Sequence, residues 1–304
     1  MKLSLIITVL NEEKTIQLLL NAIAKQTLKP SETIIVDGDS TDQTVKIIKQ
    51  FQKKHSKLNL KLFFKKGNRS VGRNFAIKKS SNALIAITDA GCIPKKEWLQ
   101  ELVVQYQKTQ AAVIAGFYQG KAKTAFEEAV IPYVLVMPDQ VNKNNFLPAT
   151  RSMLIEKTVW KQLKGFDEKL SLNEDYAFAK KMQKQQIKIA FAKKAIVEWM
   201  PRSSLEDYSE MIYRFAKGDI EAKILRPKVT LIFARYLLAL FLLIFFFITG
   251  NNLLLVYLLF LAFLYIIWSI LKNKKYCPNG WYWLPVLQIG SDLAVMFGSL
   301  SALM

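Results

Sequence analysis

Three aspartates stand where a carboxylate can do chemistry. Asp37 ends an apolar run in IIVDGDSTDQT, and Asp89 ends another in ALIAITDAGC. Asp175, in SLNEDYAFAKKM, lies where a helix is expected to begin. A carboxylate at the end of a buried strand can hold a metal or accept hydrogen bonds from a ligand, and one at a helix start can act as a base. Asp175 alone also has a structural explanation, because an acidic first-turn residue stabilises a helix.

The elements that must position these carboxylates alternate between strand and helix patterns. Short β-rich runs are followed by stretches with apolar residues at i, i+3, i+4 and i+7, and this rhythm predicts a parallel sheet with helices on its faces. Ligands bind such sheets at the carboxyl ends of the strands. The predicted strands are 3–8, 33–36, 58–64, 83–88, 112–117, 187–191 and 195–199, and the predicted helices include 71–79, 98–108, 174–184 and 205–217.

The segment 124–147 is less regular and contains two prolines, Pro132 and Pro138. It fits either an amphipathic or lipid-facing segment or a plain loop-helix-loop, and the pattern leaves both open.

The tail predicts a membrane domain at 229–304 behind a main domain at 1–228. The ranges 229–249 and 253–271 are each about the 20 residues that cross a hydrocarbon core, and 284–304 is a third candidate span, with an interfacial helix as its alternative. Basic residues flank the first two spans on one side, which by the positive-inside rule makes the main domain cytoplasmic. We therefore expect a multi-pass protein of a prokaryotic inner membrane.

Charge supports a membrane partner. The chain carries a formal net charge of +19, of which about +16 lies before residue 229. A basic domain ahead of an apolar tail fits contact with anionic membrane lipids. Nucleic acid is the competing partner, but the lysines are dispersed and no nucleic-acid-binding signature is present, so we expect none. The two cysteines, Cys92 and Cys277, form neither a disulfide framework nor a zinc spacing.

Six successive segments resemble the motifs of glycosyltransferase family 2. They are SLIITVLNEEKTI, TIIVDGDSTDQTV, SVGRNFAI, ITDAGCIPKKEWL, GFDEKLSLNEDYAFAKKM and YRFAKGD, and they cover roughly residues 3–219. Each motif is weak alone, but their order and spacing are specific. The resemblance implies an α/β fold of the GT-A type (Rossmann-like, mostly parallel sheet) and transfer of a sugar with inversion at its anomeric carbon.

The resemblance also implies how the donor is held. It places the donor nucleotide sugar against Thr8, Glu12, Asp37 and Asp39, where Asp37 can accept hydrogen bonds from a uracil or guanine N–H. It places Arg73 near the diphosphate, which a guanidinium suits.

Asp89 matches the first carboxylate of the family's Asp-x-Asp motif, which binds a divalent metal. Here the third position is Gly91, and Cys92 is a poor ligand for a hard cation. Two readings follow for Asp89. It holds Mg²⁺ or Mn²⁺ together with the diphosphate and water, or it holds a ribose hydroxyl without a metal.

Asp175 matches the family's general base, with Glu174 in support. Arg151 and Arg214 are candidates for contact with the diphosphate or the acceptor. The segment around Arg214 resembles the family's Gln-x-x-Arg-Trp element, but Glu210 and Phe215 replace its Gln and Trp, so it does not predict processive polymerisation.

Together these features predict a membrane-anchored inverting glycosyltransferase. It would move a sugar from a UDP- or GDP-linked donor to a lipid-linked or cell-envelope glycan acceptor. One alternative is a polyprenyl-phosphate sugar synthase, whose acceptor is already an anion and needs no base. Another is a non-catalytic membrane protein that binds nucleotide sugars, which the absence of the second Asp favours.

Overall fold

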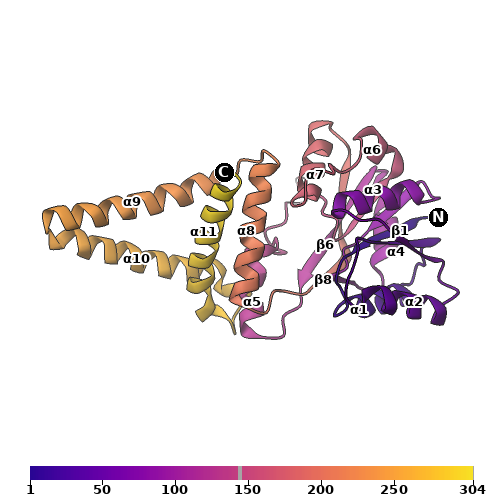
Figure 1. The fold of residues 1–304 in the computed structure, drawn as a ribbon, viewed down its shortest axis with the longest axis horizontal. Helices are drawn as coiled ribbons and strands as arrows, with labels where there is room; N and C mark the ends of the chain where they lie inside the picture. Colours follow the sequence, from indigo (N-terminus) through magenta and orange to yellow (C-terminus); the bar gives the residue numbers. More distant parts are fainter. Residues whose placement is uncertain (143–145, 304) are drawn as a thin grey trace. The chain divides into compact units, whose positions relative to one another are not determined.

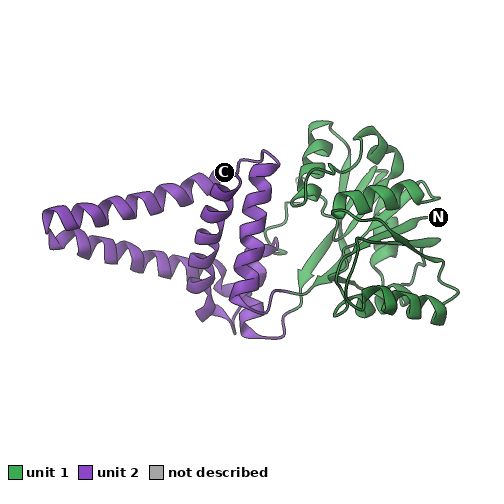
Figure 2. Ribbon diagram, in the orientation of Figure 1, with its two compact units in different colours: residues 1–121, 137–200 green, residues 122–136, 201–304 purple. Residues whose placement is uncertain are grey.

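The computed structural model describes residues 1–142 and 146–303, and the chain forms two compact units (Figure 2). We call Met1–Lys121 with Met137–Met200 the sheet unit, and Ala122–Val136 with Pro201–Met304 the helical unit. The sequence-based boundary at residue 228 falls inside the helical unit, because the amphipathic helix before it packs on the apolar tail.

The sheet unit is built on a mixed sheet. Within the described residues the strand order is β3-β2-β1-β4-β7-β6-β8-β5. β1, β2, β3 and β4 are mutually parallel, as the strand–helix rhythm predicts, while β7 runs antiparallel between β4 and β6. The strands are β1 (Ser4–Val9), β2 (Glu32–Asp37), β3 (Leu60–Phe64), β4 (Leu84–Ile87), β5 (Cys92–Pro94), β6 (Val113–Gly120), β7 (Met153–Glu156) and β8 (Ile189–Trp199).

Helices cover both faces of this sheet (Figure 1). α1 (Ile16–Ala24) buries Ile16, Leu19, Leu20 and Ile23, the face that the sequence periodicity predicts. On the other face, side chains of the central strands share one core with α3 (Arg69–Lys79), α6 (Lys157–Gln162) and α7 (Glu174–Lys184). The remaining helices of the unit are α2 (Thr44–Lys54) and α4 (Trp98–Thr109).

Two details of the sheet differ from the sequence-based expectation. The predicted strands 187–191 and 195–199 are one strand, β8, and the register of its partner β6 shifts between Gly116 and Phe117. The exposed Lys193 and Lys194 interrupt the apolar pattern there without interrupting the strand. The strands β5 and β7 were not predicted, because a run of three or four residues is too short to show a period.

Within its described residues, the helical unit contains three helices long and apolar enough to cross a membrane. α9 (Pro227–Thr249) and α10 (Asn252–Asn273) meet at Gly250, whose φ of +64° closes the turn, and diverge toward α11 (Leu284–Ser301) (Figure 1). They match the predicted spans 229–249, 253–271 and 284–304, although Met304 lies outside the described residues. α11 is the least apolar of the three and packs against α8 (Leu205–Glu221).

The irregular segment 124–147 contains one helix, α5 (Ala125–Val134), which belongs to the helical unit. The hydroxyl of Thr124 accepts a hydrogen bond from the backbone N–H of Glu127 and so caps the helix. Of the two readings of this segment, loop-helix-loop describes its backbone; its residues 143–145 lie outside the described part of the chain.

Gly72 controls how closely α3 approaches β1. A Cβ atom added at Gly72 would lie 2.8 Å from Cγ2 of Thr8, a separation that real Cβ atoms do not tolerate. The absence of a side chain therefore lets the first turns of α3 rest on the carboxyl end of β1. The next residue, Arg73, is carried into the interior by this contact.

The change Gly72→Ala tests this packing through its dependence on Thr8. In the natural background we expect the variant to lose about 1–3 kcal/mol of unfolding free energy by overpacking. With Thr8→Ser, which removes Cγ2 and keeps the hydroxyl, the same change should be neutral or stabilising by up to about 1 kcal/mol, because alanine favours a helix over glycine. Denaturant unfolding of the full chain in detergent measures both. Equal effects in the two backgrounds would contradict the contact.

Candidate functional site

Three chain segments bring four of the predicted residues together at the carboxyl edge of the sheet. Asp89 follows β4, Arg73 lies in α3, and Glu174 and Asp175 open α7. Arg73 joins these segments. Its Nη2 donates to Oδ1 of Asp89 at 2.9 Å, and its Nη1 donates to Oε1 of Glu174.

Arg73 is enclosed by protein, with 1% of its surface exposed, and Glu174 is 3% exposed. Its guanidinium also lies 5.6 Å from the ring centroid of Phe166. Burial alone would lower the pKa of Arg73, but Asp89, Glu174 and Asp175 raise it above its usual range. In this structure Arg73 therefore holds two carboxylates in place, and its Nε is buried without a hydrogen-bond partner among the described residues. The diphosphate contact that the resemblance implies stays a prediction.

Asp89 is held in its ionised form. Burial raises the pKa of a carboxylate, but the charges of Arg73, Arg69 and Arg151 outweigh it and lower the pKa of Asp89. Its side chain remains 30% exposed, and only Oδ1 is used by Arg73. Oδ2 is thus the oxygen that can reach a ligand.

Asp175 has the opposite electrostatic character. Loss of hydration, then the negative charge of Glu174, raise the pKa of Asp175, while Arg73 and Arg151 act against the rise. The side chain is half-buried, and its Oδ1 accepts the backbone N–H of Tyr176 at 2.8 Å. A carboxylate with a raised pKa and partial access to solvent has the properties of a general base.

Asp37 lies at the end of β2 and is 1% exposed. Its Oδ1 accepts the backbone N–H groups of Asp39 at 3.1 Å and Ser40 at 3.0 Å. Its Oδ2 is buried and has no hydrogen-bond partner among the described residues. Burying an acceptor without a donor costs free energy, so we expect this oxygen to accept a hydrogen bond from a group outside the chain.

Thr8, Glu12 and Asp39 lie at the same edge of the sheet but differ in exposure and in the partners of their side chains. Thr8 is half-buried in β1, and Glu12, just beyond β1, accepts the hydroxyl of Thr15 at 2.5 Å. Asp39 is exposed, has a φ of 94°, and pairs with Lys66 at 2.9 Å. The geometry of Asp39 is that of a turn residue.

Arg151 lies between two aromatic rings. Its guanidinium is 5.5 Å from the ring centroid of Tyr118 and 5.7 Å from that of Trp199, and its backbone oxygen accepts the hydroxyl of Thr88 at 2.9 Å. Cation–π contacts restrict the side chain without using its N–H groups. The positive charge of Arg151 lies close to Asp89 and Asp175, and its N–H groups have no hydrogen-bond partner within residues 1–142 and 146–303.

The structure adds Arg69 and Tyr118 to the site, whereas Arg214 belongs to the helical unit. Arg69 precedes Arg73 by one helical turn, and this i, i+4 spacing is a signal that the sequence already contains. Tyr118 carries no such signal. Arg214 is exposed on α8 of the helical unit, and its predicted contact with the diphosphate or acceptor stays a prediction.

The turn after β4 offers few metal ligands. No group of three or more His, Cys, Asp or Glu side chains is placed to hold a metal within residues 1–142 and 146–303. Burial and the charge of Asp89 raise the pKa of Cys92, so this thiol stays protonated. A Cβ built at Gly91 meets no atom within 4 Å, which means that the position would admit a side chain. Asp89 supplies one hard oxygen ligand here.

Replacing Arg73 by Met tests whether the fold depends on this buried pair. Glu174 and Asp89 would lose their counter-charge, and we expect a loss of about 3–5 kcal/mol in unfolding free energy. Lys66→Met is the matched control, because it breaks an ion pair of the same 2.9 Å length between exposed groups and should leave the unfolding midpoint unchanged. Adding Glu174→Gln to Arg73→Met should restore part of the loss. Similar effects of the two single changes would contradict the assignment.

Comparison with known proteins identifies the family of the chain. Residues 4–165 match the family described as Glycosyl transferase family 2, which is more than half of the chain. Glycosyltransferase AglE of Haloferax volcanii is 27% identical over 223 residues, 72% of this chain and 73% of the relative. The O-antigen chain rhamnosyltransferase RfbN of Salmonella typhimurium is 25% identical over 239 residues, 68% of this chain and 70% of the relative.

Two solved structures share the fold. Mannosyltransferase PcManGT of Pyrobaculum calidifontis, in complex with GDP-Man and Mn²⁺, has a TM-score of 0.68 at 15% identity, covering 97% of this chain and 87% of that one. Residues 1–349 of Staphylococcus aureus TarS, in complex with UDP-GlcNAc, have a TM-score of 0.54 at 24% identity, covering 71% of this chain and 66% of that one. They confirm the predicted α/β fold of the GT-A type. The chain belongs to glycosyl transferase family 2 and is a glycosyltransferase.

Proposed function

We propose that the chain moves a sugar from a UDP- or GDP-linked donor to a hydroxyl of a lipid-linked or cell-envelope glycan, with inversion, at the cytoplasmic face of a prokaryotic inner membrane. The observation that carries this proposal is Asp175, a half-buried carboxylate with a raised pKa beside the Arg73–Asp89 pair. Helices α9, α10 and α11, each long and apolar enough to cross a membrane, support the location.

The donor base is assigned to the edge of β2. Oδ2 of Asp37 is a buried acceptor that a uracil N3–H or a guanine N1–H would satisfy. Thr8, near the end of the neighbouring strand β1, and Glu12, just beyond that strand, are partly accessible for further contacts with the nucleoside. The two similar structures were obtained with UDP-GlcNAc and with GDP-Man, so both bases remain within the proposal.

The transfer needs one base. Asp175 takes the proton of the acceptor hydroxyl while that oxygen bonds to the anomeric carbon, and the bond from this carbon to the diphosphate oxygen breaks. A single displacement inverts the configuration and requires no second carboxylate. Arg151, with free N–H groups, neutralises negative charge on the leaving diphosphate or on the acceptor.

A divalent cation is assigned to Asp89. Oδ2 would be its one ligand from the chain, and diphosphate and water oxygens would complete the shell, a set that Mg²⁺ and Mn²⁺ accept. Bound there, the cation would neutralise charge on the diphosphate. The pairing of Oδ1 with Arg73 keeps Asp89 ionised, which a metal ligand requires.

Asp175→Asn tests the proposed base. Loss of the base should lower kcat for transfer to a hydroxyl acceptor about 100- to 10,000-fold, measured with radiolabelled UDP and GDP sugars and membrane extract. Asp167→Asn, a change of the same kind in the same segment, is the control, and its kcat should be close to that of the unchanged protein. Retained transfer to a hydroxyl acceptor would contradict the assignment. Retention with a polyprenyl phosphate as acceptor would favour the synthase alternative.

The pH dependence gives a second readout of the same base. Only ionised Asp175 accepts a proton, so the transfer rate should rise with pH through a pKa above the usual Asp range. Glu174→Gln removes the negative neighbour and should move this acidic limb to lower pH. An unmoved limb would mean that another group titrates.

Gly91→Asp tests the metal. It restores a second carboxylate at an open position, and we expect half-maximal activation of transfer at a lower Mn²⁺ concentration than in the natural chain. Gly91→Ala adds the Cβ without the charge and should leave the Mn²⁺ dependence unchanged. Identical Mn²⁺ curves for the two variants would contradict a cation at Asp89.

A further inference from the structure

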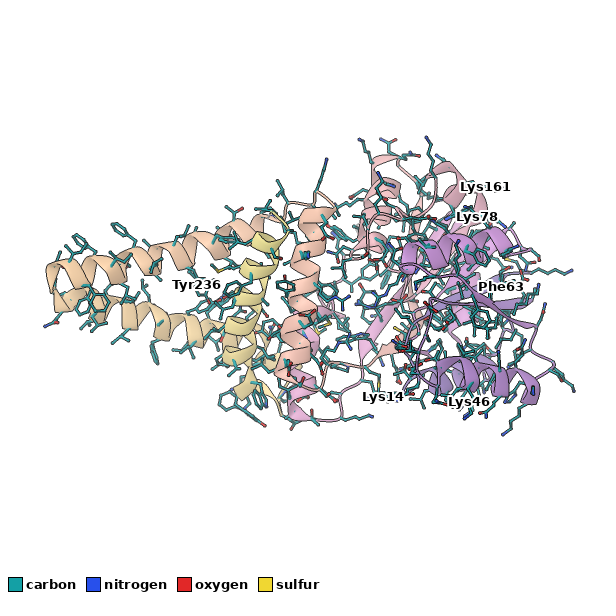
Figure 3. All side chains as sticks on the ribbon, viewed as in Figure 1. Lys14, Lys46, Phe63, Lys78, Lys161 and Tyr236 are labelled. Atoms are coloured by element: carbon teal, nitrogen blue, oxygen red, sulfur yellow. The ribbon has the colours of Figure 1, made fainter. Side chains whose placement is uncertain are left out.

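A buried carboxylate on one of the long helices of the helical unit accepts hydrogen bonds from the other two. Asp292, on α11, is 1% exposed and accepts Nη2 of Arg235 on α9 at 2.7 Å. It also accepts Nε2 of Gln288 at 3.1 Å, the hydroxyl of Tyr236 at 3.2 Å and the hydroxyl of Tyr265 on α10 (Figure 3 labels Tyr236). Three of these four donors share Oδ2, and Gln288 alone uses Oδ1.

Two lysines add positive charge to the part of the helical unit that holds Arg235. Lys228 precedes it by seven residues and so lies on the same face of α9. Lys272, near the end of α10, donates to Oε1 of Gln288 at 3.3 Å and lies 5.0 Å from the ring centroid of Trp268. Lys228 and Arg235 are close enough to Lys272 for their charges to repel it, and Asp292 is close enough to attract it. We call Lys228, Arg235 and Lys272 the cationic cluster.

The cationic cluster carries more positive charge than the chain neutralises. Asp292 balances Arg235, but within residues 1–142 and 146–303 no carboxylate pairs with Lys228 or Lys272 at ion-pair distance. Like charges held together beside apolar helices are unfavourable without an anion.

The position of the cluster along the helices indicates where that anion lies. Lys228 is about 22 residues from Gly250, which at 1.5 Å per residue is about 33 Å, the thickness of a hydrocarbon core. The turn at Gly250 and the cluster therefore reach opposite surfaces of a bilayer that the hairpin crosses. Leu231 and Leu271, next to the two lysines, are 68% and 70% exposed, so apolar surface adjoins the charge.

We propose that the cationic cluster binds the phosphate group of a membrane lipid. The phosphate oxygens pair with Lys228 and Lys272, and the hydrocarbon chain lies along the exposed apolar faces of α9 and α10. The phosphate belongs either to a bilayer phospholipid or to an isoprenoid phosphate of the kind that carries glycans. The site needs the helical unit in a membrane, and it does not rest on the proposed sugar transfer.

The test uses the full chain in dodecyl maltoside and four probes. Dioleoyl phosphatidic acid and farnesyl phosphate carry the phosphate, while diolein and farnesol are their uncharged counterparts. Binding is measured from the shift of the unfolding midpoint with lipid concentration. We expect both phosphates to bind and Lys228→Gln with Lys272→Gln to weaken them about 10- to 30-fold, from the contribution of two lysines at a membrane surface.

Lys274→Gln with Lys275→Gln is the matched control, because it removes the same charge at the same end of α10 outside the cluster. It should change both affinities less than about threefold, because neither lysine belongs to the cationic cluster that would hold the phosphate. Equal weakening by the two double variants would overturn the proposal, as would farnesol binding as well as farnesyl phosphate. Displacement of phosphatidic acid by farnesyl phosphate would extend the site to isoprenoid phosphates, and its absence would assign the site to phospholipids.

Two controls keep the result interpretable. Without lipid, the unfolding midpoint of the Lys228→Gln, Lys272→Gln variant should equal or exceed the natural one, because mutual repulsion is relieved. Stabilisation by UDP or GDP sugars, which report on the sheet unit, should be unchanged. Failure of this proposal and failure of the proposed transfer are therefore separable.

Discussion

The candidate site depends on one buried ionic interaction, that of Arg73 with Asp89 and Glu174. A guanidinium with 1% exposure is stable only if carboxylates neutralise it, and the two that do so come from distant parts of the chain. The same contact fixes the first turn of α7, where Asp175 lies. The position of Asp175, and much of its electrostatic environment, therefore depend on ion pairs in which Asp175 takes no part.

A similar device recurs in the helical unit. Arg235 and Asp292 form an ion pair between α9 and α11, and tyrosines of α9 and α10 complete the coordination of the carboxylate. In each unit an arginine and its carboxylate partners neutralise one another and hold elements of the fold together. The neighbouring charges are left for other partners: Asp175 and Arg151 in the sheet unit, Lys228 and Lys272 in the helical unit.

The sequence predicts correctly those elements whose apolar patterns are long. Clear periods or long apolar runs mark the parallel strand that ends at Asp37, the one that precedes Asp89, the helix at 174–184 and the hairpin of α9 and α10. The short strands β5 and β7 show neither. The sequence predicts two strands in place of β8, because the exposed Lys193 and Lys194 interrupt its apolar pattern. α5 is placed in the helical unit by contacts with residues about 150 positions later, including Tyr133 with Leu284, and no local pattern records these.

The sequence by itself determined which side chains are present, their order, and that two apolar helices follow an α/β domain. It also determined that the turn after Asp89 has Gly91 instead of a second carboxylate. Only the tertiary structure decided that Arg73 is buried between two acids, that the pKa of Asp89 falls while that of Asp175 rises, and that one oxygen of Asp37 lacks a donor. The physical reason is that charge interactions and desolvation depend on distance and burial, and these are set by residues that can be far apart in the chain, as Arg73 and Glu174 are.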